Sequence, residues 1–139
     1  ENMSCPTLKG AEGGCLCGAV RYRLWGAPMN VRLCHCRTCQ RAMGSPFFAR
    51  VLMPADQIEI TGETARFDSS ALLTRVFCPA CGTRLFARGL NDPPRLGVAL
   101  ATLDDPNAFS PECHIFVESK LDWVVIDDGL PQHQQRPPA

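Results

Sequence analysis

The sequence predicts a mainly β domain that is held together by metal-binding cysteines. Many short apolar or alternating segments are bounded by Gly, Pro, Asn or Asp, which is typical of β-strands. One stretch without Gly or Pro, residues 37–43, could form one or two helical turns before Gly44. Seven of the nine cysteines fall in three tight clusters. Together these observations indicate short strands arranged around bound metal.

The individual strands are identified by alternation and by their boundaries. In the first, Val20, Tyr22 and Leu24 alternate with Arg21 and Arg23, so one face is apolar and the other is charged. Further strands are expected at residues 47–53, 57–61, 65–68, 73–77, 83–88, 96–101 and 113–117.

Length and charge suit a single domain without a strongly charged partner. The chain has 139 residues, and 14 Lys and Arg balance 14 Asp and Glu, which disfavours nucleic acid or an anionic membrane as a partner. We expect a flexible segment at residues 1–12, a zinc-binding domain at 13–131 and a flexible Gln- and Pro-rich tail at 132–139. No signal peptide or bilayer-spanning run is visible, so a cytoplasmic location is expected. The patterns do not fix the oligomeric state.

The cysteines favour metal binding over disulfide bonds for three reasons. Nine is an odd number, so any disulfide scheme leaves a thiol unpaired. A chain without a secretory signal is expected in a reducing compartment. The spacings within the clusters are also tighter than disulfide frameworks usually have. Cys5 stands apart and is expected to be a free thiol.

The most natural division of the clustered cysteines is four plus three. Cys15 and Cys17, flanked by glycines, are one half-site, and Cys78 and Cys81 on a turn between two predicted strands are another, as in a zinc ribbon. Together they would make a closed four-thiolate zinc site that ties distant parts of the chain together. Such a site contributes on the order of 10–16 kcal/mol in small modules, comparable with the whole stability of a domain.

The remaining three cysteines, Cys34, Cys36 and Cys39, would leave one zinc position open, which is the feature of catalytic zinc. Zinc held by three thiolates suits a soft fourth ligand such as a substrate thiolate. Two alternatives remain open: in one, these three are spare thiols beside a single zinc, and in the other, His35, or Cys113 with His114, closes the second site. We expect His35 to point away from the metal and His114 to be an ordinary core or surface histidine. Iron–sulfur ligation is a weaker alternative because no single cluster supplies four cysteines.

Four segments resemble the glutathione-dependent formaldehyde-activating enzyme family, and together they span residues 13–131. They are GCLCGAVRY at residues 14–22, CHCRTC at 34–39, FCPACGT at 77–83, and HIFVESK at 114–120 followed by Trp123 and DGLP at 128–131. The resemblance implies the Mss-four-like fold, in which several small antiparallel sheets surround a zinc-ribbon-like structural zinc site.

The resemblance also implies roles for the cysteines and a reaction. It assigns Cys15, Cys17, Cys78 and Cys81 to a structural zinc, and Cys34, Cys36 and Cys39 to a second, catalytic zinc. The reaction is of the carbon–sulfur lyase type, in which glutathione joins reversibly to formaldehyde. The shared motifs support the zinc sites better than they support these substrates, because fold does not fix function.

Residue chemistry is consistent with addition of a thiol to an aldehyde. A glutathione-like substrate carries two carboxylates, so cationic side chains should rim its pocket, and Arg37, Arg41 and Lys120 are the candidates. No general acid can be identified from the sequence. The alternative function is a non-catalytic, zinc-stabilised protein-binding module of the same fold. Nucleic-acid binding through a zinc ribbon is the weakest hypothesis, because the arginines are scattered.

Overall fold

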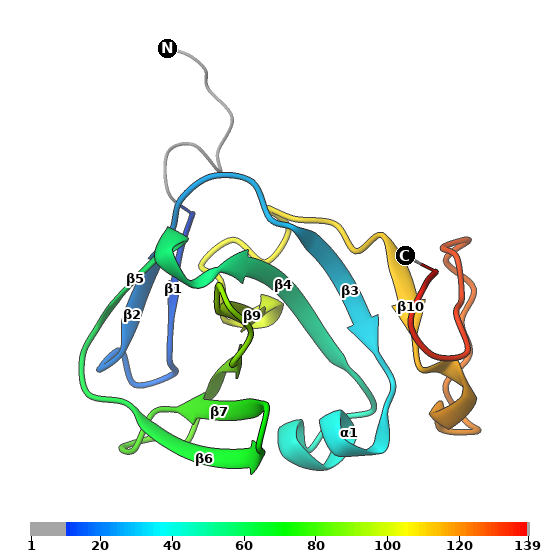
Figure 1. The fold of residues 1–139 in the computed structure, drawn as a ribbon, viewed down its shortest axis with the longest axis horizontal. Helices are drawn as coiled ribbons and strands as arrows, with labels where there is room; N and C mark the ends of the chain where they lie inside the picture. The colour runs from blue at the N-terminus through cyan, green and yellow to red at the C-terminus, as the bar shows by residue number, and fades with distance from the viewer. Residues whose placement is uncertain (1–10, 139) are drawn as a thin grey trace.

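A computed structural model describes residues 11–138 and contains two β-sheets (Figure 1). The smaller sheet has the strand order β1-β2-β5, and the larger has the order β10-β3-β4-β9-β8-β7-β6. The small sheet consists of β1 (Ala11–Gly14), β2 (Arg21–Leu24) and β5 (Ile58–Thr61). The large sheet consists of β3 (Asn30–Cys34), β4 (Phe48–Pro54), β6 (Ala65–Ser70), β7 (Leu73–Phe77), β8 (Arg84–Gly89), β9 (Arg95–Ala99) and β10 (Cys113–Ile115).

The mainly β fold class is confirmed. Within the two sheets every strand pair is antiparallel except β10 with β3, which is parallel. The short 3-10 helices are η2 (Ala55–Gln57), η3 (Leu100–Thr102) and η4 (Val117–Ser119). No helix in residues 11–138 has the length and apolar character needed to cross a membrane.

The helix α1 (Arg37–Met43) forms where the sequence predicts it. At its start the side chain of Cys36 accepts a hydrogen bond from the backbone N–H of Cys39, which satisfies one of the unpaired donors of the first turn. At its end Gly44 adopts a φ of 60°, a left-handed conformation that glycine takes without strain, and donates its N–H to Gln40. Cys36 therefore both caps the helix and projects its thiol beside that of Cys39.

The main core lies between the two sheets. The alternation predicted for β2 is confirmed, because Val20, Tyr22 and Leu24 are at most 3% exposed, whereas Arg21 and Arg23 are partly exposed and pair with acidic residues. The Tyr22 ring meets that of Phe86 edge to face at 5.2 Å, which joins the small sheet to the large one. This packing uses one face of the large sheet and leaves part of its other face for a cavity.

Some segments differ from the sequence predictions. β1 and β3 lie where no strand is expected, and the strand predicted at 96–101 ends at Ala99, where η3 begins. The flexible segment predicted at residues 1–12 falls mostly outside the described residues, as does Cys5, although Ala11 and Glu12 belong to β1.

The predicted flexible tail, residues 132–139, is instead tied to the edge of the large sheet over its described part. His133 donates its backbone N–H to the carbonyl of His114, at 3.0 Å, and the N–H groups of Phe116 and Val117 donate to the carbonyls of Gln135 and His133. The Gln- and Pro-rich composition predicts a tail without fixed contacts. These hydrogen bonds join main-chain groups, however, so side-chain composition gives no sign of them. In Figure 1 the C-terminal segment lies beside β10.

Removing residues 132–139 should therefore destabilise the protein. The deletion exposes the outer edge of β10 and removes four backbone hydrogen bonds that join residues 133–135 to residues 114–118. We expect the free energy of unfolding in urea to fall by about 1–4 kcal/mol, since each bond contributes roughly 0.5–1.5 kcal/mol. Deleting residues 137–139 alone is the control and should cost little. Equal stability of both deletions would contradict the docking of this segment.

Candidate metal centres and the adjoining cavity

Four cysteines from two distant turns meet at one place. Cys15 and Cys17 follow β1, and Cys78 and Cys81 lie on the turn between β7 and β8. Their sulfur atoms all lie within 4.8 Å of one another, with Cys15 Sγ to Cys17 Sγ at 3.6 Å and Cys17 Sγ to Cys78 Sγ at 3.8 Å. Four thiolates placed tetrahedrally about 2.3 Å from zinc lie about 3.8 Å apart. The spacing fits a metal site, and it is far longer than a disulfide bond.

Backbone and hydroxyl groups surround these sulfurs as they do in thiolate sites. Val20 donates its N–H to Cys15 Sγ at 3.2 Å, and Cys81 donates its N–H to Cys78 Sγ at 3.5 Å. The hydrogen bond from Val20 lowers the pKa of Cys15, and the Thr83 hydroxyl, 3.1 Å from Cys81 Sγ, lowers the pKa of Cys81 to about 5. These contacts favour the thiolate forms of Cys15 and Cys81, which zinc requires, whereas the crowding of the four sulfurs raises the pKa of Cys17 to about 11.

The other three clustered cysteines form a second group at the junction of β3 and α1. Cys34 ends β3, Cys36 caps the helix and Cys39 lies in its first turn, and their sulfurs also lie within 4.8 Å of one another. The pKa of Cys36 is lowered to about 2, chiefly by hydrogen bonds from Cys34 and Cys39, with a smaller contribution from the charge of Arg75. The pKa values of Cys34 and Cys39 are raised, so the group by itself favours a single thiolate at Cys36, and a bound cation would favour all three thiolates.

The assignment of both groups as zinc ligands stays a prediction that this geometry allows. Neither His35 nor His114 belongs to the second group. His35 is fully buried, and its Nε2 lies 2.8 Å from Nδ1 of His114. The expectation that His35 points away from the thiols is therefore met.

His114 is more than an isolated core histidine, because it links His35 to Asp128. Its Nε2 lies 2.7 Å from Oδ2 of Asp128, and this contact lowers the pKa of the carboxyl. A carboxylate can only accept, so neutral His114 donates to Asp128 and accepts from His35. Burial lowers the pKa of His35, which favours its neutral form. The chain of hydrogen bonds fixes the loop between Cys34 and Cys36 against the C-terminal part of the protein.

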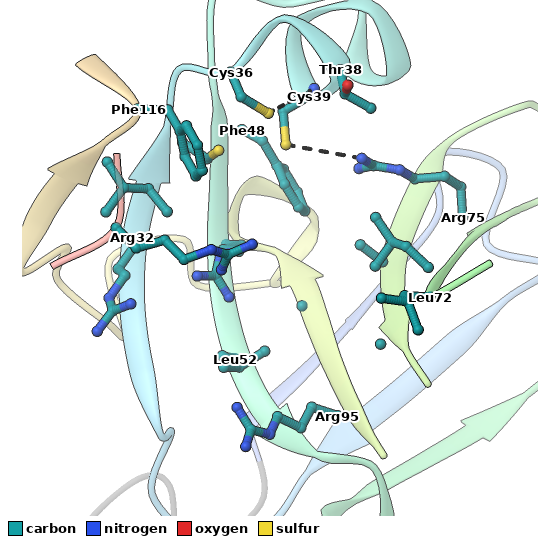
Figure 2. Close-up of a pocket in the computed structure, with 18 of the residues that line it drawn as sticks. Arg32, Cys36, Thr38, Cys39, Phe48, Leu52, Leu72, Arg75, Arg95 and Phe116 are labelled. Carbon is teal, nitrogen blue, oxygen red and sulfur yellow. Dashed lines mark hydrogen bonds between the residues drawn. The ribbon is translucent and has the colours of Figure 1, made fainter. Parts of the chain in front are cut away.

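A cavity of about 720 Å³ opens beside the three-cysteine group (Figure 2). Cys34, Cys36 and Cys39 all line it, whereas none of the four cysteines of the other group does. The wall alternates along the strands, as one face of a sheet must: Asn30, Arg32 and Cys34 on β3; Phe48, Arg50 and Leu52 on β4; Leu73 and Arg75 on β7; Ala87 and Gly89 on β8; and Arg95 and Gly97 on β9. The small residues of β8 and β9 leave the space.

The cationic residues of the cavity differ from those predicted. Arg37 and Arg41 are exposed on α1, and Lys120 donates to the backbone carbonyls of Leu121 and Val124. None of the three predicted side chains lines the cavity. The arginines that do so are Arg32, Arg50, Arg75, Arg95 and Arg136.

A signal for two of these arginines was present in the sequence. Arg32 precedes Cys34 by two residues, so on a strand both side chains point to the same face. Arg50 stands directly opposite Arg32 in the register of β3 with β4. That register depends on contacts between distant residues, which no local pattern specifies. The same is true of the approach of Arg75 from β7 and of Arg136 from the C-terminal segment.

The fold and site define a mainly β protein with two cysteine groups able to hold metal, one of which faces a cavity. The model of the family described as "Glutathione-dependent formaldehyde-activating enzyme" matches residues 10–119. The chain belongs to this family.

Individual relatives agree with this membership. A Phaeosphaeria nodorum protein is 29% identical over 91% of this chain and 68% of its own length. A Halomonas elongata protein is 29% identical over 84% of this chain and 80% of its own length. Both are provisionally named as glutathione-dependent formaldehyde-activating enzymes. An uncharacterized lyase of Schizosaccharomyces pombe is 32% identical, and the match spans 54% of this chain and 55% of that protein. A Rhodobacter sphaeroides crystal structure shares the fold, with a TM-score of 0.56 and 22% identity over 68% of this chain and 88% of that chain.

The histidine chain yields a testable expectation. Replacing His114 with Leu removes the partner of His35 Nε2 at a fully buried position, so the free energy of unfolding should fall by about 1–3 kcal/mol. Urea unfolding of the zinc-loaded protein measures this change. His133→Ala is the matched control, because that side chain forms no hydrogen bond among residues 11–138, and it should stay within about 0.5 kcal/mol of the wild type. Equal stability of the two variants would refute a fixing role for His114.

Proposed function

We propose that this protein catalyses the reversible addition of glutathione, or a similar thiol, to formaldehyde or another small aldehyde. The observation that carries the proposal is the position of the three-cysteine group, whose residues line a large cavity. The family description and the names of its relatives support glutathione and formaldehyde as substrates and a lyase as the class of enzyme.

The two cysteine groups have separate roles in this proposal. Cys15, Cys17, Cys78 and Cys81 would hold a structural zinc with four protein ligands. Cys34, Cys36 and Cys39 would hold a second, catalytic zinc beside the cavity that all three residues line. When bound there, zinc lowers the pKa of a thiol and favours its thiolate form.

The chain's own residues then position the reactants and receive charge. In the forward reaction the thiol loses its proton to solvent, its sulfur forms a bond to the aldehyde carbon, and the C=O electron pair moves onto oxygen, which takes up a proton. Arg75 lies beside the thiols, with Nη2 4.0 Å from Cys39 Sγ, and Thr38 lies on the cavity wall (Figure 2). Both side chains carry donors that can hydrogen-bond to the developing oxygen anion.

A cytoplasmic location belongs to the same proposal. Both cysteine groups must stay reduced to bind metal, and cytoplasmic thiols are kept reduced. The described cysteines are all free thiols, in agreement with this requirement.

The test is NMR exchange in an equilibrated mixture of glutathione and formaldehyde. The zinc-loaded protein should speed the interconversion of free and adduct glutathione beyond the uncatalysed rate. Cys36→Ser should lower this acceleration by at least about tenfold, because a hydroxyl does not replace a thiolate ligand, while the far-UV spectrum and unfolding midpoint stay close to those of the wild type.

Two control variants make the result specific. Cys113→Ala removes a buried thiol that belongs to neither group and should retain the acceleration. Cys78→Ser should instead unfold the chain, because it removes a ligand of the structural site. Absence of acceleration by the wild type would contradict the proposed reaction. If Cys36→Ser unfolded as Cys78→Ser does, the second group would be structural, and a binding module would be the better interpretation.

A further inference from the structure

The charge of the cavity is one-sided. Five arginines line it, and no Asp or Glu is among its described lining residues. None of these arginines belongs to an ion pair within residues 11–138, where the arginines that do are Arg21 and Arg23. Because a guanidinium stays charged at any physiological pH, five positive charges line the cavity, and the only negative charge among its described lining residues is that of the thiolates at its cysteine end.

Two of the arginines oppose each other across neighbouring strands. Arg32 on β3 and Arg50 on β4 form a directly opposite pair, an arrangement in which like charges destabilise a sheet. Burial lowers the pKa of Arg50 and the charges of Arg32 and Arg136 act in the same direction, whereas the charges of Cys34 and Cys39 oppose them. An anion between these side chains would relieve the repulsion and could accept hydrogen bonds from both.

A third arginine is buried beside the thiols. Arg75 is 7% exposed, and its Nε has no hydrogen-bond partner, as is also true of Nε of Arg32. Nη2 of Arg75 contacts Cys39 Sγ at 4.0 Å, but a buried Nε–H without an acceptor is costly, and a bound anion would supply that acceptor. Arg75 and Arg32 approach the space beneath the thiols from opposite sides in Figure 2.

The arginines also extend far from the thiols. Cys34 pairs with Phe48, and Arg95 pairs with Pro54, so Cys34 and Arg95 are separated by six residues of β4, about 20 Å along the strand. Gly97 lines the cavity between them and adds no side chain to that space; a Cβ there would lie in ordinary contact with Arg50, at 3.5 Å. Figure 2 shows Arg95 at the end of the cavity opposite the cysteines.

We propose that the natural thiol is an extended polyanion, with at least two carboxylate, phosphate or sulfonate groups and no ammonium group inside the cavity. This inference rests on the proposed function and specifies its thiol. Glutathione satisfies it in part, because its two carboxylates suit the arginines, but its ammonium group would meet five arginines and no carboxylate among the described lining residues. One anionic group would bind between Arg32 and Arg50 and another near Arg95.

The test compares glutathione with its deaminated form, glutaryl-cysteinyl-glycine, in which hydrogen replaces the ammonium group without added bulk. Their S-methyl derivatives isolate recognition by the cavity, since neither has a free thiol to bind metal. By calorimetry at low salt, the deaminated derivative should bind the zinc-loaded protein about five- to tenfold more tightly. Equal or tighter binding of S-methylglutathione overturns the inference.

A matched pair of arginine variants locates the effect. Arg95→Gln, at an exposed cavity position, should weaken binding of the S-methyl deaminated compound about fivefold. Arg88 lies between the cavity-lining residues Ala87 and Gly89 on β8, so its side chain faces away from the cavity. The Arg88→Gln variant should therefore bind the compound as the wild type does. Equal losses in both variants, or no loss in Arg95→Gln, would count against an anion site at the far end.

Exchange rates measured with the two free thiols separate this inference from the proposed function. Faster turnover of the deaminated thiol with formaldehyde supports both. Acceleration of glutathione that equals or exceeds that of the deaminated thiol leaves the function standing and overturns the inference. Acceleration of neither thiol overturns the proposed function, while the order of the two binding constants still decides whether the cavity selects polyanions.

Discussion

The meeting of four sulfur atoms from two turns is the constraint on which the architecture depends. One turn follows the first strand of the small sheet, and the other joins β7 to β8 in the large sheet, 61 residues later for Cys17 and Cys78. Leu16 reinforces the junction by donating its N–H to the Thr83 hydroxyl. Four thiolates so close would repel one another without a cation, so their arrangement is understandable only as a metal site or as protonated thiols. A metal there would fix the two sheets relative to each other at one end. One face of the large sheet would then pack in the core, and the other would line the cavity.

The second cysteine group uses that fixed sheet for a different purpose. Cys34 is the last residue of β3, which lies between β4 and β10, so its position is set by two neighbouring strands. Cys36 and Cys39 come from a helix whose cap is one of the thiols themselves. The group is therefore rigid on the side of the protein and open towards the cavity, where small residues and arginines lie among apolar side chains. Preorganised charge of this kind is effective because it need not rearrange during reaction.

Local patterns predicted the parts of this structure that depend on neighbours in sequence. The alternation around Tyr22, the bounds of α1 and the turn that carries Cys78 and Cys81 all follow from periodicity and from Gly or Pro positions. The two groupings of cysteines could be proposed because zinc chemistry limits how ligands combine. The arginine cavity could not be predicted in this way, because it requires the register of five strands. The docking of residues 132–138 could not be predicted either, because it depends on backbone groups that any sequence possesses.

In the proposed function one cysteine group is a closed metal site and the other is an open one. Cobalt substitution distinguishes the two, because the absorption bands of cobalt(II) respond to a change in its ligands. We expect two cobalt ions per chain, both with thiolate-to-cobalt charge-transfer bands. Added glutathione should then change the ligand-field bands of one ion and leave those of the other intact, and Cys36→Ser should abolish the responsive set. A spectrum that glutathione leaves unchanged, with both ions bound, would contradict the open site.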